Sequence, residues 1–221
     1  MTFWQFLEAK GAYLLTTLLG GWPQTAIVAL GSLLFALIFG LAVSLLRLSA
    51  WRPLRWPAIA YIEFFRGTPA LVQLFVIYFG LPDIGLSPTP LQAAIVGLGL
   101  NGAAYLAEIY RAGIESIHRG QMEAALALGL TPAMAMQHIV LPQAVRTMLP
   151  PITSFAIVLL KDTAIVFSVG VVEIMALARN LVTETLHSAA VYLIAGLLYL
   201  CMTIPMSRLA AHLERQRQAW H

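Results

Sequence analysis

Charged residues are scarce in this sequence. They make up 10% of the 221 residues, whereas 60% of the residues are hydrophobic. Because soluble domains carry about 25% charged residues, no water-soluble fold of this length could bury that much apolar surface. We therefore expect an all-α membrane protein that uses lipid as part of its solvent. The formal net charge of +3 is too small to suggest a nucleic-acid partner.

Catalytic and metal-binding patterns are also missing. The single cysteine, Cys201, excludes an internal disulfide and a cysteine-based metal site. The five histidines fall in no metal-binding spacing, and no GxSxG nucleophile elbow occurs. A GxxxxGKS or GxxxxGKT loop, which would cradle the phosphates of ATP, is absent as well. We predict a protein with no catalytic residues, no metal site and no cofactor of its own.

Long apolar runs predict five transmembrane helices. A helix needs about 20 apolar residues to cross the hydrocarbon core. Residues 1–22 are too polar in pattern to cross, and we expect them to form an interfacial segment. A membrane domain at 23–210 and a cytoplasmic tail at 211–221 follow. The spans are expected near residues 25–47, 57–82, 86–110, 150–172 and 188–207.

The basic residues orient this map. Of the 13 lysines and arginines, ten fall on one side, while only Lys10 and Arg179 fall on the other and Lys161 lies within the fourth span. Because cytoplasmic loops carry the excess of basic residues, the N-terminus is predicted to be outside and the C-terminus inside. The longest cytoplasmic loop is then 111–147, and the basic C-terminal end would rest on anionic membrane lipid.

Helix-capping residues divide this loop into two short helices. Good helix formers at Gln121–Leu128 end at Gly129, a natural helix terminator. Thr131 suits the N-cap of a second helix, and Pro132 suits its first helical position. The second helix, Ala133–Val140, is expected to stop before Leu141-Pro142, because proline disfavours helix in the residue before it. The hairpin either packs passively onto the span ends or serves as a handle for an external motor.

One motif in the hairpin resembles a known family. Glu123-Ala124-Ala125, then Gly129, then Leu141-Pro142 resemble the EAA loop of ABC importer permeases. In that family the short helix sits in a cleft of the ATP-binding subunit and relays its closure to the membrane. The resemblance implies that these residues form a coupling helix that contacts a separate ATPase.

Three further stretches resemble the polar amino acid branch of that family. They are the stretch from Glu63 to Phe75, which contains Arg66-Gly67-Thr68-Pro69 and Gln73, the approach to the hairpin at residues 104–114, and Leu160-Lys161-Asp162-Thr163-Ala164. The resemblance implies a multi-pass subunit of the bacterial inner (plasma) membrane that carries a polar, basic amino acid by alternating access. It also implies three protein partners: nucleotide-binding ATPase subunits that hold ATP and Mg, a second permease subunit, identical or paralogous, and a periplasmic or extracellular amino acid-binding protein.

Two charges fall inside the predicted fourth span. Lys161 and Asp162 would each cost about 3 kcal/mol near the bilayer centre, and neighbours at i and i+1 on a helix do not face each other. Each therefore needs another partner, either in a buried network or along the substrate pathway. In the pathway Asp162 could pair with a cationic or α-amino group. Thr163 could contact substrate or only its own backbone.

Ion pairs are possible near the inner ends of two spans. Glu108 and Arg111 are three residues apart and could form a local pair. The alternative is a gate contact to Glu63 or Arg66, which have the same spacing on the second span. In the second interpretation Glu63, Arg66, Glu108 and Arg111 are gate candidates.

The second and third spans carry two further candidates. Pro69 weakens the helix at Gly67-Thr68-Pro69 because it removes a backbone donor. Such a break could expose backbone to a ligand or be a tolerated kink. Asn101 is a substrate candidate among glycines that allow close helix packing. An ATPase-independent secondary transporter or channel is the alternative function, but it does not account for the hairpin.

Overall fold

The computed structural model describes residues 3–218, and all regular structure within them is helical. The predicted all-α class is confirmed. The α-helices are α1 (Phe3–Leu19), α2 (Trp22–Leu48), α3 (Arg52–Gly67), α4 (Ala70–Phe75), α5 (Pro90–Glu115), α6 (Arg119–Ala127), α7 (Pro132–Ala135), α8 (Leu141–Asp162), α9 (Ile174–Thr185) and α10 (Ser188–Gln218). Single π turns at Val76–Gly80 and Met136–Val140 and 3₁₀ turns at Leu81–Ile84 and Thr163–Val169 link some of them.

Four helical segments are long and apolar enough to cross a membrane, and a bent pair can supply a fifth crossing. The four segments lie at Phe3–Leu48, Pro90–Glu115, Pro132–Val169 and Ser188–Arg215. The bent pair consists of α3 and the helical stretch Ala70–Ile84. The helix axis bends by 107° between them. The helix expected at 57–82 is therefore broken. Pro69 explains the position of the break, because it lacks an N–H and drives the residue before it out of helix.

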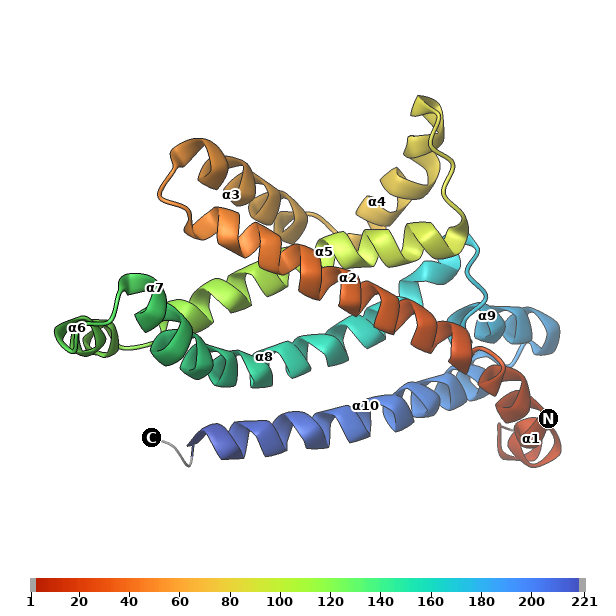
Figure 1. Cartoon of the computed structure of the whole chain (residues 1–221). Helices are drawn as coiled ribbons and strands as arrows, with labels where there is room; N and C mark the ends of the chain where they lie inside the picture. The colour runs from red at the N-terminus through yellow and green to blue at the C-terminus, as the bar shows by residue number, and fades with distance from the viewer. Residues whose placement is uncertain (1–2, 219–221) are drawn as a thin grey trace.

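Helices α2 and α5 cross closely at the centre of the bundle (Figure 1). Glycines allow this approach, as the sequence predicted. A Cβ atom at Gly99 would lie 2.7 Å from the Phe35 ring, and one at Gly102 would lie 3.0 Å from the Cβ of Ala36. Van der Waals packing of this kind holds helices together in lipid, where the hydrophobic effect between them is weak.

The two chain ends lie at opposite ends of the bundle (Figure 1). At one end α1 and α9 pack together through buried side chains such as Leu14, Leu18 and Leu181. At the other end the hairpin of α6 and α7 projects, and α10 runs toward it. This arrangement fits an odd number of crossings. The inside and outside assignment, and the interfacial position of residues 1–22, stay predictions.

Several helix boundaries differ from the expected ones, and those of α8 and α10 differ most. Helix α8 begins at Leu141 instead of near residue 150. It ends with Lys161 and Asp162, and a 3₁₀ turn follows. Helix α10 continues past the predicted span end at 207 as far as Gln218. Most of the expected tail is thus helical, and residues 219–221 lie outside the described part.

The second hairpin helix does not stop before Leu141-Pro142, which corrects the prediction. The π turn at Met136–Val140 carries the backbone from α7 directly into α8. Pro142 offers no N–H for the bond to residue 138, and a wider turn tolerates that loss. The Gln143 side chain helps because its Nε2 donates to the carbonyl of Ile139 at 2.8 Å.

Candidate functional site

Local capping chemistry builds the hairpin as the sequence predicted. Gly129 follows α6 with φ +84°, and the N–H of Leu130 donates back to the carbonyl of Ala125 at 3.1 Å. These are the marks of a Schellman helix end. The Thr131 hydroxyl then accepts from the N–H of Met134 at 3.3 Å and starts α7. The turn between the two helices is therefore set by nearby residues alone.

The hairpin presents apolar side chains to its surroundings. Leu128 is 84% exposed at the tip, and Leu126 is 42% exposed. Glu123, Ala124 and Gly129 are exposed as well, whereas Ala125 is buried. A helix that packed passively onto the span ends would hide these leucines. Exposed apolar residues on a projecting element are typical of a protein contact surface, which favours the handle interpretation.

The base of the hairpin rests on α5 and α8. A cavity of about 470 Å³ lies there between Ile114 and Ile117 on one side and Met122, Met136 and Val140 on the other. Across the hairpin base, Nε2 of Gln143 donates to Oε1 of Gln121 at 3.3 Å. A push on α6 therefore reaches two membrane helices, and the cavity leaves room for small movement.

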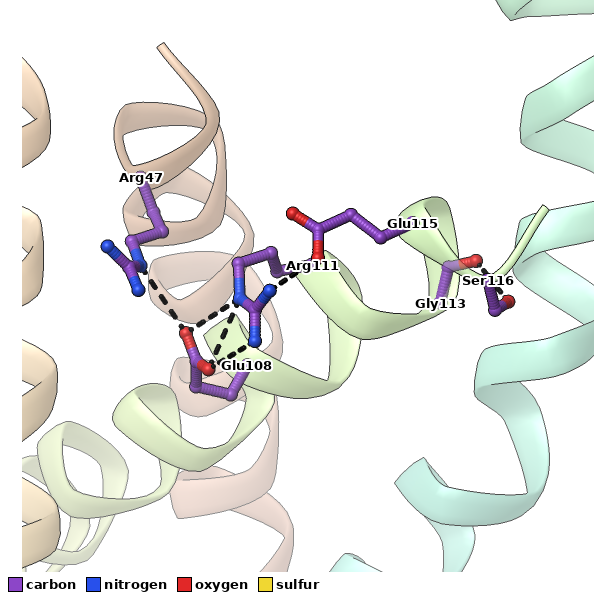
Figure 2. Close-up of polar contacts among 6 residues, drawn as sticks. All are labelled: Arg47, Glu108, Arg111, Gly113, Glu115 and Ser116. Atoms are coloured by element: carbon purple, nitrogen blue, oxygen red, sulfur yellow. Dashed lines mark hydrogen bonds and ion pairs between the residues drawn. The ribbon is translucent and has the colours of Figure 1, made fainter. Parts of the chain in front are cut away.

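Glu108 lies at the centre of an ion network where α5 leaves the bundle (Figure 2). Its Oε2 is 2.8 Å from Nη2 of Arg111, which confirms the local pair. Arg111 also bonds to Glu115 one turn later. Within residues 3–218 no ion pair joins Glu108 or Arg111 to Glu63 or Arg66. The additional partner is Arg47 of α2, whose Nε lies 3.6 Å from Oε1 of Glu108.

Two amide side chains close the break between α3 and α4. The Nε2 of Gln73 donates to the carbonyls of Phe65 at 2.9 Å and Thr68 at 3.0 Å. The Nδ2 of Asn101 donates to the same Phe65 carbonyl at 3.1 Å and to Oε1 of Gln73 at 3.0 Å. Backbone carbonyls freed in lipid must find such donors. Asn101 thus supports the break together with Gln73, which lies in the stretch that resembles the family but had no role predicted from the sequence.

Arg66, near the same break, is linked to α8 through two aromatic rings. Its guanidinium lies over the Tyr105 ring, 5.5 Å from the centroid, and that ring stacks on Phe155 at 5.6 Å. The fold therefore brings Arg66, Thr68 and Asn101 together. Glu63 is exposed on α3, and no ion pair is recorded for it in the part of the chain that the structure describes.

The three polar residues at the end of α8 have different surroundings. The buried Thr163 hydroxyl donates to the carbonyl of Leu160 at 2.7 Å. Lys161 is exposed and lines a cavity of about 460 Å³ with Tyr192 and Tyr199. Asp162 is partly buried. Its carboxylate forms no hydrogen bond or ion pair with the residues that the structure describes. Lys161 and Asp162 do not pair, as their spacing predicted.

A buried carboxylate at the opposite end of the bundle was missed by sequence reasoning. Glu173 is fully buried, and its two oxygens accept from the Tyr199 hydroxyl at 2.6 Å and the N–H of Ala176 at 2.9 Å. The next residue, Ile174, donates its N–H to Thr25 at 3.4 Å. Burial raises the pKa of Glu173. Its place directly before a helix was the only signal.

Comparisons with known proteins agree with the hairpin motif. Residues 36–218 match the model of a family described as "Binding-protein-dependent transport system inner membrane component". The probable glutamine ABC transporter permease protein GlnM of Bacillus subtilis (strain 168) is 38% identical over 89% of this chain and 91% of its own. The arginine transport system permease protein ArtQ of the same organism is 38% identical over 90% and 91%.

A solved structure gives the same likeness in three dimensions. It is the crystal structure of an amino acid ABC transporter with histidines. The similarity covers 98% of this chain and 99% of the solved chain, with 34% identity and a TM-score of 0.88. Nearly the whole chain, hairpin included, therefore shares one fold with that transporter.

Proposed function

The chain belongs to the family of binding-protein-dependent transport system inner membrane components, and we propose that it imports a polar, basic amino acid. It is a multi-pass permease of the bacterial inner membrane, and ATP hydrolysis belongs to separate partner subunits. The observation that carries the proposal is the projecting hairpin, with Glu123-Ala124-Ala125 on α6 and exposed leucines at its tip.

In the proposed mechanism the ATPase moves the hairpin and the hairpin moves the spans. The partner ATPase holds ATP and Mg and closes on α6. Displacement then passes into α5 and α8, on which the hairpin rests, and through Glu108 into α2, because Arg47 and Arg111 both face that carboxylate. Alternating access follows if these helices tilt together against a second permease subunit, identical or paralogous. A periplasmic or extracellular binding protein delivers the substrate.

The substrate class is inferred from relatives and from one residue. Similar permeases carry names for glutamine and arginine transport, which supports an amino acid as cargo. Asp162 has no recorded partner within residues 3–218, so its carboxylate is available for a cationic group. That group can be a basic side chain or the α-amino group of any amino acid, so the basic class in this proposal rests on the arginine permease among the relatives.

Reconstituted transport tests the role of the hairpin. The complete permease pair is combined with its ATPase in proteoliposomes and supplied with the binding protein, and uptake of radiolabelled amino acids is measured with and without ATP. We expect Glu123→Ala to lower ATP-driven uptake by at least about tenfold, as for a truncated interface hot spot. Glu214→Ala, which removes an exposed carboxylate on α10, is the matched control. Uptake that persists without the ATPase would instead support a secondary transporter.

A further inference from the structure

A cavity at the hairpin end of the bundle lies beside the ion network of Glu108, and the proposed transport mechanism assigns no ligand to it. It lies where α2 ends, α3 begins and α5 leaves the bundle, and its volume is about 340 Å³. Its polar lining consists of Arg47, Arg55, Arg111 and Glu115. Three guanidinium groups from three different helices thus converge on one small space.

The guanidinium groups in this cavity are not equally satisfied. Arg111 bonds to both Glu108 and Glu115 (Figure 2). Arg47 reaches Glu108 only at 3.6 Å, and its buried Nε has no hydrogen-bond partner. The guanidinium of Arg55 has no ion pair or hydrogen bond with the residues that the structure describes. Because the Nε of Arg47 is buried against Glu108, the donors still available to an anion are the Nη groups of Arg47 and the guanidinium of Arg55.

The charge balance indicates what kind of anion would fit. Three arginines face two carboxylates, Glu108 and Glu115, which leaves an excess of one positive charge. A phosphodiester carries one negative charge and offers several acceptor oxygens to guanidinium groups. A single phosphodiester would neutralise the excess and give Arg47 and Arg55 acceptors.

The remaining walls of the cavity are apolar and lie at the expected depth of the membrane surface. Leu48, Trp56 and Ile59 line it beside the arginines. Trp56 is 64% exposed, and Trp51 in the preceding connection is 63% exposed. Exposed tryptophans of this kind sit at the level of lipid headgroups. A lipid could therefore place its phosphate on the arginines and its glycerol and upper acyl carbons against the apolar wall.

We propose that this cavity binds the phosphodiester headgroup of one anionic phospholipid from the predicted inner leaflet. Arg47 and Arg55 donate to the phosphate, and Trp56 and Ile59 contact the lipid body. The bound lipid would join α2 and α3 and would lie beside Glu115, one turn before the chain enters the hairpin. This site is distinct from the hairpin surface, but it shares Arg47 and Arg111 with the ion network that joins α2 to α5.

Native mass spectrometry of the purified full-length chain tests the site. The chain is titrated with phosphatidylglycerol, which is anionic, and with phosphatidylcholine, which has no net charge. We expect one phosphatidylglycerol to bind tightly, and Arg55→Gln to weaken its binding about fivefold, the usual effect of one basic residue at an anionic surface. Arg55→Lys keeps the charge and should retain most of the affinity.

Matched controls separate this site from general surface charge. Arg179→Gln removes an exposed arginine on α9, outside the cavity, and should leave lipid binding unchanged. An equal loss in Arg55→Gln and Arg179→Gln would overturn the site. Equal binding of phosphatidylcholine would overturn recognition of the anionic charge. Displacement of the lipid by glycerol 3-phosphate at equal concentration would assign the cavity to a soluble phosphate compound instead.

Discussion

Asp162 places a carboxylate at the end of a helix that is long enough to cross a membrane. It closes α8, is partly buried, and has no hydrogen bond or ion pair recorded within residues 3–218. Lys161 precedes it directly and lines a cavity together with Tyr192 and Tyr199. Ionisable groups inside membrane proteins are costly and usually serve a function. We therefore expect Asp162 to meet either substrate or a second subunit.

Replacement of this carboxylate by an amide distinguishes the two partners. Asp162→Asn keeps the size of the side chain and removes its charge, so we expect the KM for a basic amino acid to rise about tenfold, the size of one lost charged hydrogen bond. Asp83→Asn, in an exposed turn, should not change KM. Unchanged kinetics in Asp162→Asn would exclude a substrate role, and loss of the assembled complex would indicate a subunit contact.

At the scale of elements, the hairpin depends on one left-handed residue. Gly129 has φ +84°, and a Cβ atom at this position would meet nothing within 4 Å. The expected cost of a side chain is therefore conformational and not steric. It amounts to about 1 kcal/mol for an ordinary L-residue, and asparagine, which tolerates this conformation, should avoid most of it.

The left-handed turn predicts a graded effect on coupling. Gly129→Ala should loosen the turn and raise the number of ATP molecules hydrolysed per amino acid transported, whereas Gly129→Asn should keep the ratio near the unmodified value. Gly11→Ala, in α1 with open space around it and no positive φ, is the control. Uptake and ATP hydrolysis are measured on the same proteoliposomes. Equal ratios in Gly129→Ala and Gly129→Asn would remove the turn from the coupling mechanism.

At the scale of the whole molecule, cysteine labelling can show which end of the bundle lies on which side of the membrane. Leu128 lies at the hairpin tip, and Thr183 lies on α9 at the opposite end, and both are exposed. In a Cys201→Ser background we expect Leu128→Cys to react with an impermeant maleimide only from the cytoplasmic side. Thr183→Cys should react only from the outside. The reverse pattern would contradict the positive-inside orientation.

Much of the fold was predictable because its causes are local. Apolar runs of sufficient length have few alternatives to crossing a bilayer as helices. Gly129 and Thr131 act on their immediate neighbours, so the hairpin turn could be read from consecutive residues. The break at Pro69 was predictable for the same reason, since proline acts on its own N–H and on the residue before it.

The remaining features depend on residues far apart in the chain. The 107° angle at the break is held by Gln73 and Asn101, whose partner carbonyls could not be identified from spacing. Arg47 approaches Glu108 only because α2 and α5 pack closely. Arg55 lines one cavity with Arg47 and Arg111 because α3 contacts both of these helices. The sequence by itself determined which segments cross the membrane and where they turn, through hydropathy and backbone chemistry. Only the tertiary structure decided which polar side chains meet, because helix packing sets those distances.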